Sequence, residues 1–106
     1  MAAGLAAGCG AHRTSMNEAV LRYVCGDVCG HVHVRLSNVR HAGDYATAEV
    51  TSIPPGRVQG DHVLLQRVDG DWRFIDAWSS LGGLTCADVA RQMRVPETIL
   101  HRLGVC

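Results

Sequence analysis

The 106-residue sequence lacks a net charge, a long apolar run and the common catalytic motifs. Its ten Lys and Arg side chains balance ten Asp and Glu side chains, whereas nucleic-acid-binding surfaces and polybasic membrane patches need a basic excess. No apolar stretch approaches the roughly 18–20 residues that cross a bilayer. Glycine-rich phosphate loops, nucleophile elbows and His-Glu-x-x-His metal motifs are also missing. We therefore expect no nucleic-acid partner and no cofactor, and a non-enzymatic role is favoured over an enzymatic one.

Aromatic side chains are scarce too, at two Trp, two Tyr and one Phe. Both tryptophans and the phenylalanine fall in one strand-like run, as Trp72, Phe74 and Trp78. Their even spacing predicts that they share one face of that strand and pack in the core. The alternative is that Trp78, near the strand end, borders a binding surface, where aromatic anchors are common.

The composition is that of a folded protein, with 47% apolar and 19% charged residues. Residues 1–13 are rich in Ala and Gly and predict a flexible tail before a single domain at 14–106. The tail's sequence LAAGC, ending at Cys9, resembles the end of a bacterial lipoprotein signal, where small residues precede a lipidated cysteine. This resemblance implies a lipid anchor on Cys9 as the only route to a membrane; the alternative is an incidental cysteine in a flexible tail.

A helix is predicted to begin at Ser15, because Ser15 and Glu18 have the spacing of a capping box. Residues 31–39 and 45–53 alternate between apolar and polar side chains, which predicts two half-buried strands joined by a turn at 40–44. A β-hairpin follows at 61–78, reversing at Asp69-Gly70 through a loop of two or three residues.

Two short helices are expected after the hairpin. Thr85 and Asp88 form a second capping pattern, for a helix that ends at Met93, and Val95-Pro96 separates it from a helix over 96–103. The fold class is therefore α+β: an N-terminal helix packed on a four-stranded antiparallel sheet, with one or two short C-terminal helices.

Five cysteines are an odd number, and more than a typical cytosolic protein of this length carries. With Cys9 set aside, the remaining four allow three pairings, of which one pair of disulfides is favoured. Cys25 and Cys29 would brace the turn after the first helix, and Cys86 and Cys106 would pin the C-terminal helices. Disulfides of this kind predict export to an oxidising compartment.

The segment from Cys25 to His33 also contains Cys29 and His31, which gives four nitrogen or sulfur ligands in nine residues. Zinc and copper both accept such ligands. A metal site made of Cys25, Cys29, His31 and His33 is therefore the alternative to a Cys25–Cys29 disulfide with exposed histidines.

Polar side chains near the predicted sheet raise an enzymatic alternative. They are Asp76, His62, Glu49, His41 and Tyr45. A pocket between helix and sheet can hold an Asp/His acid–base pair, but no spacing ties Asp76 to a particular histidine.

The order of elements resembles the cystatin-like or NTF2-like arrangement, in which a curved sheet wraps a helix. More narrowly, the run RVDGDWRFIDAW, then Cys86, Val95-Pro96-Glu97 and the ending LGVC resemble small exported bacterial domains of unassigned function. The resemblance implies a disulfide-stabilised, extracytoplasmic domain that is periplasmic, cell-surface or secreted. We expect a non-enzymatic binding or accessory role with a protein or small-molecule partner. The alternatives are the metal module and an NTF2-like enzyme with a helix–sheet pocket.

Overall fold

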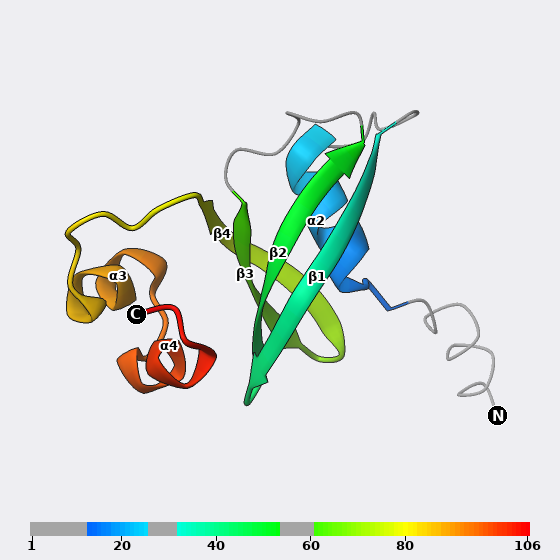
Figure 1. Cartoon of the computed structure of the whole chain (residues 1–106). Coiled ribbons are helices and arrows are strands. Elements are labelled where there is room, and N and C mark those ends of the chain that lie inside the picture. Colours follow the sequence, from blue (N-terminus) through cyan, green and yellow to red (C-terminus); the bar gives the residue numbers. More distant parts are fainter. Residues whose placement is uncertain (1–12, 26–31, 54–60) are drawn as a thin grey trace, which may run out of the picture.

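A computed structural model describes residues 13–25, 32–53 and 61–106 of the chain. Its elements, in order, are α2 (Met16–Cys25), β1 (His33–Ala42), β2 (Tyr45–Ile53), β3 (His62–Val68), β4 (Asp71–Trp78), α3 (Cys86–Met93) and α4 (Glu97–Leu103). The strands form one antiparallel sheet in the order β1-β2-β3-β4. Figure 1 shows α2 along one face of the sheet and the α3–α4 pair on its other side. The predicted α+β class is confirmed, with both short C-terminal helices present.

Helix α2 begins at the predicted capping box. The Ser15 hydroxyl accepts a hydrogen bond from the Glu18 amide at 3.1 Å, and the Glu18 carboxylate accepts one from the Ser15 amide at 3.0 Å. Ala19 and Val20, one turn on, are buried against the sheet. The small side chain of Ala48 in β2 belongs to the same cluster, which lets the helix lie close to the sheet.

The β3–β4 hairpin reverses through two residues. Val68 pairs with Asp71, and Asp69 and Gly70 have φ angles of 53° and 86°. Positive φ at both central positions is what a type I′ turn requires, and Asp-Gly is a preferred sequence for it. The two-residue register, which places Arg67 opposite Trp72, is therefore the correct one.

Strand β4 contains an irregularity that the alternation did not predict. Leu64 pairs with Asp76 but Leu65 pairs with Phe74, so Ile75 is an extra residue in β4. Such a bulge shifts the alternation of faces. Trp72 and Phe74 pack with α2, whereas Trp78 packs with α3 and α4 on the opposite face. The prediction that all three aromatics share one face is wrong for this reason.

Strand β1 also contains a bulge. Ser37 pairs with Glu49 and Arg40 with Thr47, so Asn38 and Val39 together oppose one residue of β2. Asn38 has a φ of 51°, a left-handed conformation that asparagine tolerates better than most residues. The strand then continues to Ala42. The turn predicted over 40–44 is confined to Gly43 and Asp44, because residues 40–42 still pair with β2.

The second apolar layer lies on the face away from α2. It joins Leu64 of the sheet to Val89, Leu100 and Leu103 of the two short helices, and all four side chains are almost fully buried. Helix α3 begins at the predicted Thr85–Asp88 capping box. No helix within 13–25, 32–53 and 61–106 has the length and apolar character needed to cross a membrane.

Candidate functional site

An open groove of ≈ 630 Å³ lies over the sheet face that α2 does not cover. Its floor comes from all four strands, and residues 103–105, at and just after the end of α4, form one wall. Its lining residues include Asn38, Arg40, Glu49, His62, Trp78 and Leu103. The volume is within the range of small-ligand sites, about 300–1,000 Å³.

The floor is organised by the register of the sheet. Glu49 of β2 lies opposite His62 of β3, and His62 lies opposite Trp78 of β4. Directly opposed residues project from the same face, about 4.5–5.5 Å apart at Cβ. A carboxylate, an imidazole and an indole therefore form one row across the groove. The His62 and Trp78 rings are stacked, with centroids 5.9 Å apart and planes inclined by 23°.

One hydrogen bond from β1 holds the wall, and another orients a floor residue. The Arg40 guanidinium donates to the Leu103 carbonyl at 3.3 Å, and the Asn38 amide donates to the Glu49 carboxylate at 2.5 Å. Gly104 caps α4 with a φ of 76°, and a Cβ atom there would collide with the Arg40 guanidinium. The β1 bulge and the α4 cap thus shape the groove together.

The structure separates the five polar residues that the sequence singled out. His62 and Glu49 meet in the groove. Asp76 is exposed and accepts a hydrogen bond from the Ala77 amide at 2.8 Å. His41 lies 5.9 Å from the Trp72 ring, and Tyr45 packs half-buried against the α3–α4 cluster. Trp78 packs partly buried against the α3–α4 cluster and also lines the groove. Its role in a binding surface stays a prediction.

The space between α2 and the sheet is filled rather than hollow. Ala19 and Val20 of the helix meet Val50, Val63 and Leu65 of the sheet in one cluster, and all five side chains are buried. The NTF2-like enzyme hypothesis required a pocket there, lined by Asp76 and a histidine. The groove instead lies on the opposite face, and Asp76 is not among its lining residues.

The predicted Cys86–Cys106 disulfide is present, with a Cα–Cα distance of 5.4 Å. Cys86 is the first residue of α3, so the bond ties the end of the chain to the start of that helix. Cys25 is also disulfide-bonded. Cys29 lies outside the described residues, so the Cys25–Cys29 pairing stays a prediction.

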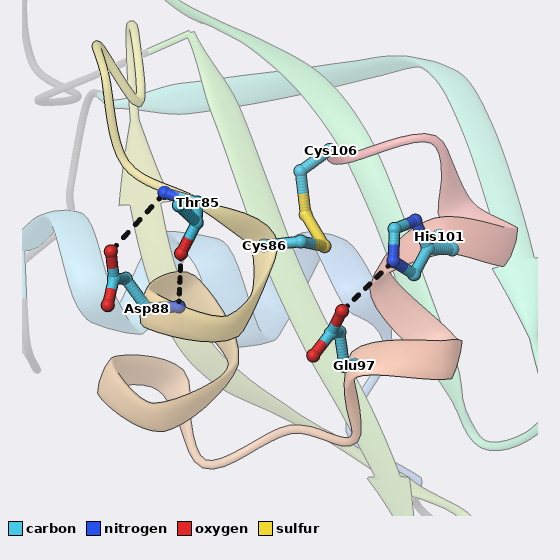
Figure 2. The surroundings of a disulfide bond; sticks show 6 residues. All are labelled: Thr85, Cys86, Asp88, Glu97, His101 and Cys106. Atoms are coloured by element: carbon cyan, nitrogen blue, oxygen red, sulfur yellow. Dashed lines mark hydrogen bonds and ion pairs between the residues drawn. A yellow bond between two sulfur atoms is a disulfide. The ribbon is translucent and has the colours of Figure 1, made fainter.

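Two further ligand-type side chains lie beside the Cys86–Cys106 bond. Glu97 and His101 are one turn apart on α4, and the Glu97 carboxylate lies 3.2 Å from the His101 Nε2. Cys86 Sγ, a Glu97 oxygen and a His101 nitrogen all lie within 4.8 Å of one another. Figure 2 shows the two α4 side chains next to the disulfide. Sequence reasoning missed this pair, although its i,i+4 spacing on an expected helix was the signal for it.

The metal ligands predicted from the sequence are only partly described. Cys29 and His31 lie outside the described residues, as does the proposed lipid anchor, Cys9. His33 is an exposed residue at the start of β1. The bond at Cys25 leaves that sulfur no thiolate for a metal. The four-ligand site remains a prediction for the reduced chain only.

Known proteins offer no guide to this groove or to the disulfide region. No protein family, curated protein or solved structure matches the chain significantly. Function is therefore inferred from the geometry of the residues themselves.

Proposed function

We propose that this chain is a non-enzymatic binding or accessory domain of the bacterial cell envelope. Its ligand is a small molecule, or the end of a peptide, with an apolar ring and polar substituents. The observation that carries this proposal is the row of Glu49, His62 and Trp78 in a groove of ≈ 630 Å³. Binding sites commonly combine an aromatic surface with a few converging polar groups.

Each polar group of the groove has a role that suits recognition. Arg40 keeps further guanidinium N–H groups beyond the one that holds Leu103, since arginine has five. Glu49 is oriented by Asn38, and the His62 ring is fixed against Trp78. A ligand ring would contact the indole, while its polar groups would reach the Glu49 carboxylate or the Arg40 guanidinium.

The disulfides support the extracytoplasmic part of the proposal. Protein disulfides persist in oxidising compartments and are rare in the cytosol, and Cys25, Cys86 and Cys106 are all disulfide-bonded. We place the domain outside the cytoplasm, with a lipid on Cys9 as its membrane anchor. Fatty-acid labelling in a bacterial host tests this, with the protein expressed together with the coding sequence upstream of Met1: label should enter the wild type and be lost in Cys9→Ser. Label retained by Cys9→Ser, or absent from both, contradicts the anchor.

The groove itself is tested by fragment screening with ¹H–¹⁵N NMR on the oxidised protein. The two indole signals are internal controls for each other, because Trp78 lies in the groove and Trp72 packs with α2. We expect ring-containing polar fragments to shift the Trp78 indole and leave the Trp72 indole in place. His62→Ala should weaken these fragments, whereas His41→Ala, the matched histidine beside Trp72, should not. Shifts confined to the α2 side, or equal behaviour of the two variants, would refute the site.

A further inference from the structure

Three metal-binding side chains, those of Cys86, Glu97 and His101, converge where α3 and α4 meet. Cys106 joins them as the disulfide partner of Cys86. Glu97 and His101 are exposed by about half, at 48% and 54% of their side-chain surface, so an ion could reach them from solvent. Cys86 is partly buried beneath them, against the α3–α4 apolar cluster. None of these residues lines the groove described above.

The donor set matches the preferences of zinc. Zinc is usually bound by four cysteine, histidine or carboxylate ligands in a tetrahedron. Ligand nitrogen and oxygen atoms at 2.0–2.1 Å from such an ion lie about 3.3 Å apart. The Glu97 and His101 atoms are already 3.2 Å apart. Two thiolates at about 2.3 Å from the ion lie about 3.8 Å apart, so the sulfur–sulfur bond must first be broken.

We propose that the reduced protein binds one zinc ion through Cys86, Cys106, Glu97 and His101, and that zinc binding and the disulfide are alternative states of this site. In the oxidised state neither sulfur carries the thiolate that a metal needs. In the reduced state the ion takes over the disulfide's structural role, because it again joins the chain end to the start of α3.

A dithiol reductant breaks the sulfur–sulfur bond and supplies two electrons and two protons, and is itself converted to a disulfide. The products are two thiols, at Cys86 and Cys106. Zinc then displaces both thiol protons to solvent, and His101 binds as a neutral imidazole.

The test uses the full chain reduced with a phosphine, which leaves as the phosphine oxide with an oxygen atom from water. Alkylation is run with and without zinc and mapped by trypsin. Cleavage after arginine places Cys86 in peptide 74–91, Cys106 in peptide 103–106, and Cys25 with Cys29 in peptide 23–35. We expect zinc to protect Cys86 and Cys106 together from alkylation, because the thiolate that attacks the reagent is then held by the metal. Protection of peptide 23–35 alone would overturn the proposal and favour the Cys25/Cys29/His31/His33 site.

If zinc protects all three peptides, substitutions show which cysteines bind the metal. In a Cys25→Ser/Cys29→Ser background, cobalt added to the reduced protein should give the thiolate-to-metal charge-transfer absorption, and the oxidised protein should not. His101→Gln and Glu97→Gln should each weaken cobalt binding by about 10–100-fold. His33→Gln is the matched control and should leave it unchanged. Equal cobalt binding by His101→Gln and His33→Gln, or by oxidised and reduced protein, would refute the proposal. Should the background variant not fold, the same three substitutions are read by zinc protection in the wild-type background.

Discussion

Replacing both Cys86 and Cys106 by alanine should lower the free energy of unfolding by about 3 kcal/mol. The bond links residues 20 positions apart. In the chain-entropy treatment, closing a loop of about 20 residues removes roughly 11 cal/mol/K from the unfolded chain, which is about 3.3 kcal/mol at 25 °C. Alanine keeps the Cβ of the half-buried Cys86, so little apolar contact is lost beside it.

The assay is urea unfolding under non-reducing conditions, which leaves the bond at Cys25 intact. Fluorescence can resolve the two layers, because Trp78 packs with α3 and α4 while Trp72 packs with α2. Trp72→Phe and Trp78→Phe backgrounds therefore each report on one face of the sheet. If the domain unfolds in one step, both backgrounds should show the same midpoint and the same loss of stability in the double-alanine variant.

A loss below about 1 kcal/mol would refute the loop-closure reasoning, since it would mean that the unfolded chain gains little freedom. A loss reported by Trp78 alone would refute single-step unfolding. It would show that the α3–α4 layer can leave the sheet while α2 stays packed.

Gly104→Ala should lower the melting temperature, because the backbone φ of 76° disfavours alanine and the added Cβ would collide with the Arg40 guanidinium. Arg40→Ala in the same chain removes the collision and should recover part of the loss, which a double-mutant cycle measures. Deleting Ile75 should lower stability severely, since removing the bulge forces Trp78 toward the α2 face. Near-ultraviolet circular dichroism would detect the lost packing of Trp78. An unchanged spectrum would contradict the assignment of Ile75 as the bulge residue. Hydrogen bonds from Thr85 hold the pKa of Asp88 below its ordinary value of 3.8. A carboxyl whose pKa is lower in the folded than in the unfolded protein stabilises the fold at pH values above the unfolded pKa. The difference in melting temperature between the wild type and Asp88→Asn should therefore shrink as the pH falls below about 4. A difference that stays constant from pH 6 to 2 would exclude this.

The elements that the sequence predicted well are those set by neighbouring residues. Both capping boxes need only residues three apart, and they begin α2 and α3 where the sequence placed them. The Asp69-Gly70 turn is equally local, because its two positive φ angles depend on those two residues. The Cys86–Cys106 disulfide was also predictable from the sequence, since two short helices between the cysteines can bring their ends together.

The bulges were not predictable by the same means. Alternation in DWRFIDAW fits an unbroken strand, and the extra residue at Ile75 emerges only from the pairing of β4 with β3. In β1, Val34 and Leu36 lie on the sheet face that packs against α2, as the alternation predicts. The register shift at Asn38 and Val39, however, depends on pairing with β2. The groove was missed for this reason, as its floor joins residues from four strands.

The groove and the disulfide share one short segment, residues 103–106. The Leu103 carbonyl accepts the Arg40 hydrogen bond that forms the groove wall, and Cys106, three residues later, is bonded to α3. Between them, the Val105 amide donates to the Leu100 carbonyl at 3.0 Å, which turns the chain back toward α3. One segment is therefore fixed at one end to β1 and at the other to Cys86. The two bulges place Arg40 and Trp78 on the face that this segment borders, so the shape of the groove depends on sheet irregularities and on the clamp at the chain end together.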